Sequence, residues 1–213
     1  MAITQETLAS AIDRAQARMV GLTDELNAAD AKLGDGDTGT MLARLIGTFA
    51  GVDIRGAPDL GAAFMALAKA GAASTGSSLG TLVITAMMTA GKASTGKPTI
   101  EWSALSGLLL AIRDAAMGRG KAELGAKTII DGLDFLARGI ADKSDAEGMA
   151  RAADQAMRSA LDVFRPLPCT MGRARMFAEK SVGMDDPGML ALAELVWAVS
   201  GNQDIHDETP VLA

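Results

Sequence analysis

The chain has 213 residues, a formal net charge of −6 and 49% hydrophobic residues, with no Tyr, five Phe and two Trp. This length supports one sizeable core, and abundant Ala, Leu and Met with few aromatic residues favour an all-α, single-domain protein over residues 1–213. The acidic balance, without a dense Lys/Arg cluster, argues against nucleic-acid binding. No apolar stretch approaches the roughly 20 residues that span a bilayer, so we expect no membrane insertion.

Cysteine and histidine content limits the chemistry. The lone Cys169 cannot form an internal disulfide, and the N-terminal residues lack a basic segment followed by an apolar run. Both features favour a cytoplasmic protein. The only histidine, His206, lies in a polar tail, residues 201–213, that we expect to be frayed. A Ser-His-Asp site therefore has little support.

The first half of the chain predicts five helical segments. Apolar residues recur at helical spacing over residues 8–22, with Thr4 as a candidate N-cap, although Thr7 stands where a capping box has Glu or Gln. Further helices are expected over residues 23–33, 38–51 and 60–71. Residues 82–88 are apolar on nearly every side, which is typical of a central helix.

The second half predicts helices near residues 105–117, 129–140 and 149–164, and a last one from residue 187. Pro166 and Pro168 end or kink the third of these, while Asp186 and Pro187 suit the N-cap and the first turn of the last. The pattern contains about eight helices and no convincing strand. It predicts one α-helical bundle.

Three carboxylates, Asp30, Asp35 and Asp37, lie around a glycine-rich turn. Gly34 and Gly36 let the backbone fold tightly enough for the three to converge. Hard divalent cations prefer such oxygen-only sites, and the helix expected from Thr38 directs its free N–H groups to the same volume. The alternative interpretation is a purely structural Asx-turn with helix caps and no metal. Spacing alone leaves the metal site and the structural turn both open.

Two other segments could contact phosphate. Residues 74–81 form a glycine- and hydroxyl-rich entry into a helix, without the Gly-Lys-Ser/Thr of a P-loop, and a helix cap is the commoner interpretation. Arg173, Arg175 and Lys180 form a cationic group that either binds a diphosphate or forms a solvated face with surface ion pairs.

Four segments, in order, resemble the nucleotide-binding L subunit of dihydroxyacetone kinases, in the glycerone kinase family. They are Asp30-x4-Asp35-Gly-Asp37-x-Gly39, Ala73-Ser-Thr-Gly-x3-Gly80-Thr81, Arg119-Gly-Lys-Ala-Glu-x-Gly125-x-Lys127-Thr128, and Gly172-Arg-Ala followed by Glu179-x-Ser181-x-Gly183-x2-Asp186-Pro-Gly188. Together they extend from residue 30 to residue 188. The resemblance thus covers most of the chain.

The resemblance implies a closed barrel of eight amphipathic, antiparallel helices, with ADP or ATP bound at one end through two Mg²⁺ ions. The implied magnesium ligands are Asp30, Asp35 and Asp37. The implied nucleotide contacts are Thr38, Gly39, Thr40, Met41, Ser74, Thr75, Gly120, Ile129, Arg173, Asp186, Pro187 and Gly188.

The implied activity is phosphoryl transfer to a short-chain ketose held on a separate K-type subunit. The phosphoryl source is either exchanging ATP or a resident ADP that a phosphotransferase-system protein rephosphorylates. Thr38 departs from the family pattern, which has His there, and Asp-Gly-Asp-Thr-Gly-Thr resembles instead the N-terminal domain of fatty acid kinases. The sequence also leaves open a non-catalytic module that senses nucleotide state for a regulator, and a Met-rich bundle that carries an apolar ligand.

Overall fold

The computed structural model describes residues 2–201, and its regular secondary structure there is almost entirely helical. Its α-helices are α1 (Gln5–Asp30), α2 (Thr38–Ala50), α3 (Leu60–Ala72), α4 (Ser78–Ala93), α5 (Leu105–Gly120), α6 (Ile129–Gly139), α7 (Ala146–Phe164) and α8 (Pro187–Ser200). The structure also contains two 3-10 turns, Trp102–Ala104 and Arg173–Phe177. Two short strands, β1 (Ala2–Ile3) and β2 (Ile100–Glu101), form an antiparallel pair. The all-α prediction is confirmed, and the strand pair is the exception.

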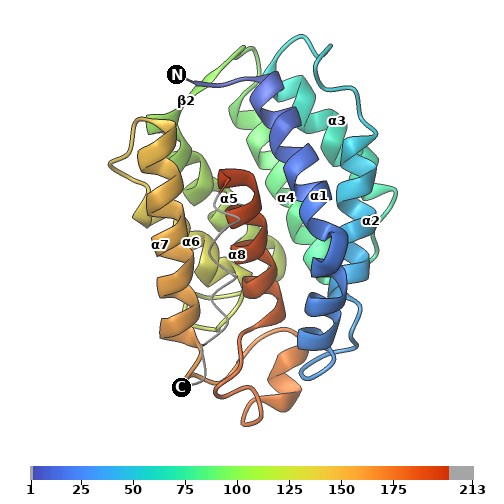
Figure 1. The fold of residues 1–213 in the computed structure, drawn as a ribbon, viewed down its shortest axis with the longest axis vertical. Coiled ribbons are helices and arrows are strands. Elements are labelled where there is room, and N and C mark those ends of the chain that lie inside the picture. Colours follow the sequence, from blue (N-terminus) through green and yellow to red (C-terminus); the bar gives the residue numbers. More distant parts are fainter. Residues whose placement is uncertain (1, 202–213) are drawn as a thin grey trace, which may run out of the picture.

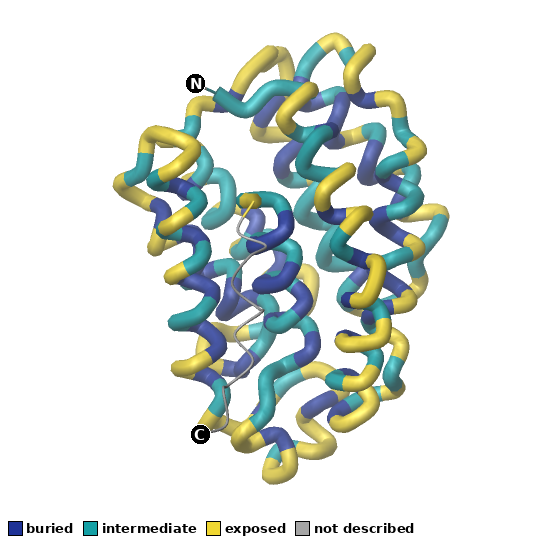
Figure 2. The backbone as a smooth tube through the Cα atoms, in the orientation of Figure 1, coloured by how far each residue is buried: buried dark blue, intermediate teal, exposed yellow. Residues whose placement is uncertain are grey.

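The helices form a closed ring. Each helix from α1 to α7 packs against the next, and α8 returns to α1 (Figure 1). Two hydrophobic clusters fill the ring and share Leu109 and Leu190. Buried stretches lie on the inward sides of the helices (Figure 2). The predicted closed barrel of about eight helices is confirmed for the described residues.

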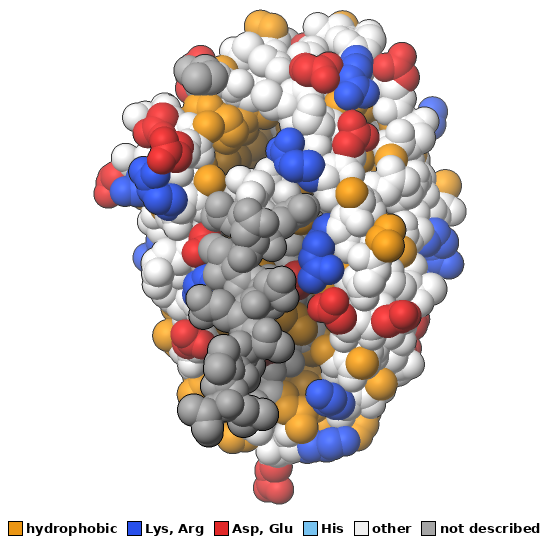
Figure 3. All heavy atoms as spheres, viewed as in Figure 1, with side chains coloured by type: hydrophobic (Ala, Val, Ile, Leu, Met, Phe, Trp, Pro, Cys, Tyr) orange, Lys and Arg blue, Asp and Glu red, His pale blue; other side chains and the backbone are white. Residues whose placement is uncertain are grey.

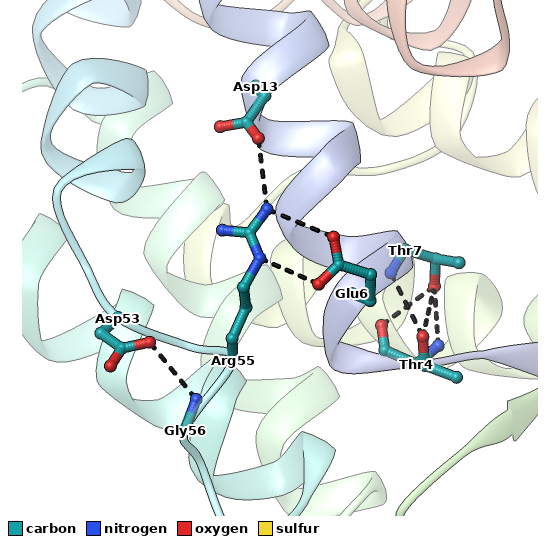
Figure 4. A network of polar contacts seen from close by, with 7 residues as sticks. All are labelled: Thr4, Glu6, Thr7, Asp13, Asp53, Arg55 and Gly56. Carbon is teal, nitrogen blue, oxygen red and sulfur yellow. Dashed lines mark hydrogen bonds and ion pairs between the residues drawn. The ribbon is translucent and has the colours of Figure 1, made fainter.

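Helix α1 is held at its N-terminus by a capping box of an unusual kind. The Thr4 Oγ1 accepts from the Thr7 N–H, and the Thr4 N–H donates to the Thr7 Oγ1 at 2.7 Å (Figure 4). A hydroxyl therefore takes the place of the expected Glu or Gln. Beside it, the Arg55 guanidinium bridges Glu6 and Asp13, which ties the connection between α2 and α3 to α1 (Figure 4).

The two helices expected over residues 8–22 and 23–33 are both present, one on each side of a kink inside α1. Val20 and Gly21 leave the helical conformation inside α1, with φ +90° at Gly21. The break thus comes before the predicted Thr23 start, and the helix ends at Asp30 instead of residue 33. The second half of α1 carries Asp30 toward one end of the ring.

The expected central helix is not central. The run over residues 82–88 lies in α4, where only Gly80, Ile84, Ala90 and Gly91 are buried and Met88 is exposed. In a closed ring every helix is part of the wall, so even an apolar helix keeps an outward side. Residues 202–213, with His206, lie outside the described residues.

None of the helices within residues 2–201 combines the length and the apolarity needed to cross a bilayer. On the face shown in Figure 3, acidic and basic side chains are interspersed and form no continuous basic stripe.

Candidate functional site

The acidic turn joins α1 to α2, and its three carboxylates converge. One oxygen each from Asp30, Asp35 and Asp37 lies within 4.8 Å of the others. Asp30 is buried at the end of α1, whereas the other two are exposed. Such a group of oxygens can hold a divalent cation.

The convergence depends on glycine. A Cβ at Gly34 would collide with the Asp30 carboxylate, and Gly36 has φ +76°, a conformation that L residues rarely adopt. Both glycines are therefore required for the turn to close on Asp30.

The three carboxylates differ in their part in helix capping. The N–H groups of Asp37 and Thr38 donate to the Asp30 Oδ2 at 3.0 and 3.2 Å, so Asp30 caps the start of α2 from the preceding helix. Asp37 is the N-cap residue by position, yet its side chain accepts no capping hydrogen bond. An Asx-turn with helix caps thus accounts for Asp30 in part, and it leaves the Asp37 carboxylate unused.

The three carboxylates line a cavity of about 510 Å³, and four helices begin at its wall. Its wall includes Thr38 at the start of α2, Ser78 of α4, Ile129 of α6 and Pro187 of α8. The first N–H groups of a helix have no intrahelical partner, and the helix dipole is positive there. Four such ends favour an anion with several oxygens, such as a diphosphate.

Arg173 adds a cation to the same wall. It lies in the loop between α7 and α8, at the start of its 3-10 turn, and its guanidinium pairs with the Asp35 carboxylate. Arg175 is exposed and does not line the cavity, and the Lys180 ammonium lies 5.7 Å from the centre of the Phe177 ring. The cationic group predicted from sequence therefore separates, with Arg173 alone of the three at the cavity.

Asp186 closes the cavity at the start of α8. Its Oδ1 accepts from the Met189 N–H at 2.8 Å, which confirms the predicted N-cap, and Pro187 occupies the first turn. Burial raises the pKa of Asp186 to about 6, against the opposing effect of the N–H groups of Met189 and Gly188.

Apolar side chains also line the cavity. Met41, Leu79, Leu82 and Ile129 contribute to its wall. A wall that carries both charged and apolar side chains suits a molecule with a phosphate end and a flat apolar end.

The structure brings together most of the residues proposed from sequence. Those that line the cavity are Asp30, Asp35, Asp37, Thr38, Met41, Gly120, Ile129, Arg173, Asp186, Pro187 and Gly188. Gly39, Thr40, Ser74 and Thr75 are not in its wall.

Each of these four residues has a role in the packing or hydrogen bonding of the fold. A Cβ at Gly39 would strike the Thr23 carbonyl, so this glycine permits the close approach of α2 to α1. The Thr40 N–H donates to the Asn27 Oδ1 at 3.1 Å. The Ser74 hydroxyl donates to the Gly71 carbonyl at 3.0 Å, and the Thr75 Oγ1 accepts from the Ser77 N–H at 3.4 Å. None of the four lines the cavity, and their contact with a nucleotide stays a prediction.

Ser77 and Ser78 line the cavity at the start of α4. They lie within the hydroxyl-rich segment of residues 74–81 but were not among the individual contacts expected from the resemblance. The Ser77 Oγ accepts from the Gly80 N–H at 2.9 Å, so α4 begins at Ser78. A serine three residues before Gly80 and directly before an apolar run is an N-cap signal. That signal could have added Ser77 to the expected contacts.

Known proteins with similar sequences support one family. Residues 32–201 match the model of the DAK2 domain. The chain is 28% identical over 203 residues to the L-erythrulose kinase of Pectobacterium atrosepticum, covering 91% of this chain and 34% of that protein. It is 29% identical to the ADP-binding subunit DhaL of the PEP-dependent dihydroxyacetone kinase 2 of Listeria innocua, covering 78% of this chain and 79% of that protein.

Solved structures support the same fold. The dihydroxyacetone kinase of C. freundii matches with a TM-score of 0.70 at 23% identity, over 92% of this chain and 34% of that chain. The same kinase in complex with AMP-PNP and Mg²⁺ matches with a TM-score of 0.68 at 23% identity, over 95% of this chain and 35% of that chain. The chain thus spans about a third of these kinases and of the L-erythrulose kinase. Its sequence and its ring of helices agree: the chain belongs to the DAK2 domain family.

Proposed function

We propose that this chain binds ADP or ATP with magnesium in the cavity and transfers a phosphoryl group to a short-chain ketose held on a separate K-type subunit. The observation that carries the proposal is the convergence of Asp30, Asp35 and Asp37 on a cavity that four helix N-termini enter. Oxygen ligands for a hard cation and N–H donors for phosphate are the two requirements of a magnesium–nucleotide site.

The residues present fit that group. The three carboxylates would hold two Mg²⁺ ions, with Asp30 kept in orientation by the N–H groups of α2. Thr38, Ser77 and Ser78 would bind the phosphates, and Leu82 and Ile129 would contact the nucleoside. When bound, magnesium would neutralise phosphate charge during transfer.

Arg173 has a second role in the proposal. Without a ligand its guanidinium pairs with Asp35. With a nucleotide present, the same guanidinium would donate to phosphate oxygens and offset the charge of the transferred group. This role needs the loop between α7 and α8 to remain in place.

The relatives' names support both the ligand and the acceptor class. DhaL proteins of Listeria innocua and Lactococcus lactis are called ADP-binding subunits of dihydroxyacetone kinases, and the longer Pectobacterium relative is called an L-erythrulose kinase. Each name specifies a ketose, and about two thirds of the longer kinase lies outside the part matched by this chain. We therefore assign acceptor binding to a partner of the K type.

Calorimetry with Mg²⁺ and ADP tests the proposal directly. Wild type is expected to bind, and Asp35→Asn to bind at least about tenfold more weakly, since it loses an anionic ligand. Asp142→Asn, in the exposed connection between α6 and α7, is the matched control and should bind like wild type. Equal affinities for wild type and Asp35→Asn would refute the proposal.

The phosphoryl source separates two versions of the function. ADP that stays with the purified protein through dialysis would favour a resident coenzyme rephosphorylated by a phosphotransferase-system protein, and ready exchange would favour ATP. Thr38 can donate a hydroxyl to phosphate but cannot accept a phosphoryl group or a proton as an imidazole does. Transfer from ATP to dihydroxyacetone in the presence of a K-type subunit would count against a purely regulatory module.

A further inference from the structure

Lys127 is a fully buried lysine close to the cavity but outside its wall. The residue is only 1% exposed, and its Nζ donates to three backbone carbonyls: those of Arg165 at 3.1 Å, Leu167 at 2.7 Å and Ser181 at 2.8 Å. An ammonium group has three N–H donors and a neutral amine has two. The three carbonyls therefore match the charged form, although burial lowers the pKa of Lys127.

The carbonyls belong to the two arms of one loop. Residues 165–185 leave α7 and return to α8, and Arg165 and Leu167 lie on the outgoing arm while Ser181 lies on the returning arm. The Gly183 N–H donates to the Arg165 carbonyl at 2.8 Å, and the Arg165 guanidinium pairs with Asp185. Lys127 thus joins the arms from inside, and the ion pair joins them at the surface.

Lys127 itself is fixed where α6 begins. The Asp131 Oδ1 accepts from the Gly125 N–H at 2.6 Å, and its Oδ2 accepts from the Thr128 N–H at 2.8 Å. Between them Lys127 has φ +60°, which is unfavourable for a residue with a Cβ. The conformation sends the side chain into the loop while Thr128 and Ile129 continue to the cavity wall.

The loop carries Arg173. From Met171 to Ala174 it lines the cavity, and Arg173 reaches the Asp35 carboxylate. Beyond Ala174 it presents exposed Met176, Phe177 and Val182. Its buried contacts there include a hydrogen bond from the Cys169 N–H to the Ser181 Oγ at 2.7 Å and the packing of Met184 on a small apolar cluster. With so few buried apolar contacts, polar contacts contribute much of the order of this loop.

We propose that Lys127 is a positioning residue of this site: its buried ammonium closes the loop of residues 165–185 from within and so holds Arg173 at the cavity. The inference rests on the proposed function for its effect on nucleotide binding, but not for its effect on the loop. Lys127 also couples two walls, because its backbone begins α6 and its side chain organises the loop.

Limited proteolysis without nucleotide tests the loop. Lys127→Met removes the ammonium and keeps an unbranched side chain, and Lys69→Met, at an exposed position of α3, is the matched control. An arginine-specific protease should cleave Lys127→Met after Arg173 and Arg175 at least about tenfold faster than wild type or the control, because the opened loop fits a protease site. Circular dichroism establishes that the variant is folded.

A double-mutant cycle tests whether Lys127 acts through Arg173. Mg–ADP affinity should fall about tenfold in Lys127→Met, and the variant that also carries Arg173→Ala should bind no more weakly than Arg173→Ala alone. A lysine that merely stabilises the fold would give additive losses. If Lys127→Met does not fold, Lys127→Gln, which retains an N–H donor, is used for both experiments.

Three results would overturn the proposal: unchanged cleavage at Arg173 and Arg175, additive losses in the cycle, or loss of the whole fold in both variants. The last would make Lys127 a core residue instead. If wild type itself does not bind Mg–ADP, the proposed function fails, and the proteolysis experiment still decides whether Lys127 holds the loop.

Discussion

Arg173 and Asp35 show how two exposed residues can matter for binding and little for stability. Their side chains are 60% and 46% exposed, so their ion pair is screened by water and adds little to the free energy of unfolding. Its significance lies in charge: the guanidinium offsets one of three neighbouring carboxylates and stands beside the expected phosphates. Binding and folding can therefore be separated at this position.

Arg173→Ala is expected to weaken Mg–ADP binding about tenfold to a hundredfold, the effect of losing charge-assisted hydrogen bonds to phosphate. Its free energy of unfolding should change by less than about 0.5 kcal/mol. Calorimetry and urea unfolding measure the two quantities. Arg175→Ala, two residues along the same loop and away from the cavity, is the control, and an equal loss of affinity there would contradict a specific role for Arg173.

Asp186 gives the protein without ligand a pH-dependent stability. Burial raises its pKa from 3.8 to about 6, so the folded protein favours the protonated carboxyl group. The resulting contribution to the free energy of unfolding is complete below the unfolded-chain pKa and is lost as the pH rises through about 6.

Asp186→Asn cannot ionise, and it keeps an oxygen for the Met189 N–H. Relative to wild type, its free energy of unfolding should therefore increase between about pH 4 and pH 7, by on the order of 2 kcal/mol. Urea unfolding in the presence of a chelator measures this difference at each pH. A difference that stays constant over the range would show that Asp186 keeps an ordinary pKa.

At the scale of single elements, the break in α1 matters most for the site. Val20 and Gly21 interrupt the helix, so its second half can take its own direction and end with Asp30 at the cavity. Gly21 has φ +90°, and no atom lies within 4 Å of where its Cβ would be. A side chain at residue 21 would therefore cause backbone strain but no steric clash.

Gly21→Ala should therefore lower the free energy of unfolding by about 1–2 kcal/mol. Gly47 in α2 is a matched control, because a Cβ there also meets nothing within 4 Å but the backbone is helical. Gly47→Ala should raise the free energy of unfolding by about 0.5–1 kcal/mol. Chemical denaturation of both variants measures the contrast, and a loss at both positions would argue against strain as the cause.

What the sequence predicts well is local in origin. Hydrophobic spacing predicts α2 and α3 almost to the residue, and the Asp186–Pro187 signal predicts the start of α8. The acidic turn is predictable because its carboxylates lie close together along the chain. The same reasoning did not single out Ser77, the N-cap of α4.

What the sequence leaves out depends on distant partners. The strand pair joins Ile3 to Ile100, and the Thr40 N–H is used by Asn27 of another helix. In the sequence Lys127 looks like an ordinary charged loop residue. Only the fold shows that the loop between α7 and α8 surrounds it. Such pairings follow from ring closure, which no local pattern contains.

At the scale of the whole molecule, the ring explains why residues far apart in sequence share one cavity. Helices α2, α4, α6 and α8 all begin at the same end, so Thr38, Ser78, Ile129 and Pro187 meet there. The connections on the other side, such as residues 51–59 and 94–99, are remote from the cavity wall. A ligand bound at one end should therefore restrain four helix starts at once.

Hydrogen exchange can test this convergence. If phosphate oxygens accept from the free N–H groups of several helices, Mg–ADP should slow exchange in the first turns of α2, α4, α6 and α8 together, by about tenfold or more at saturation. Residues 51–59 and 94–99 are the internal control and should be unchanged, and Asp35→Asn should abolish the effect at the same ligand concentrations. Slowing in the first turn of α2 alone would mean that the acidic turn binds the metal without the other helices, and that the cavity is not one nucleotide site.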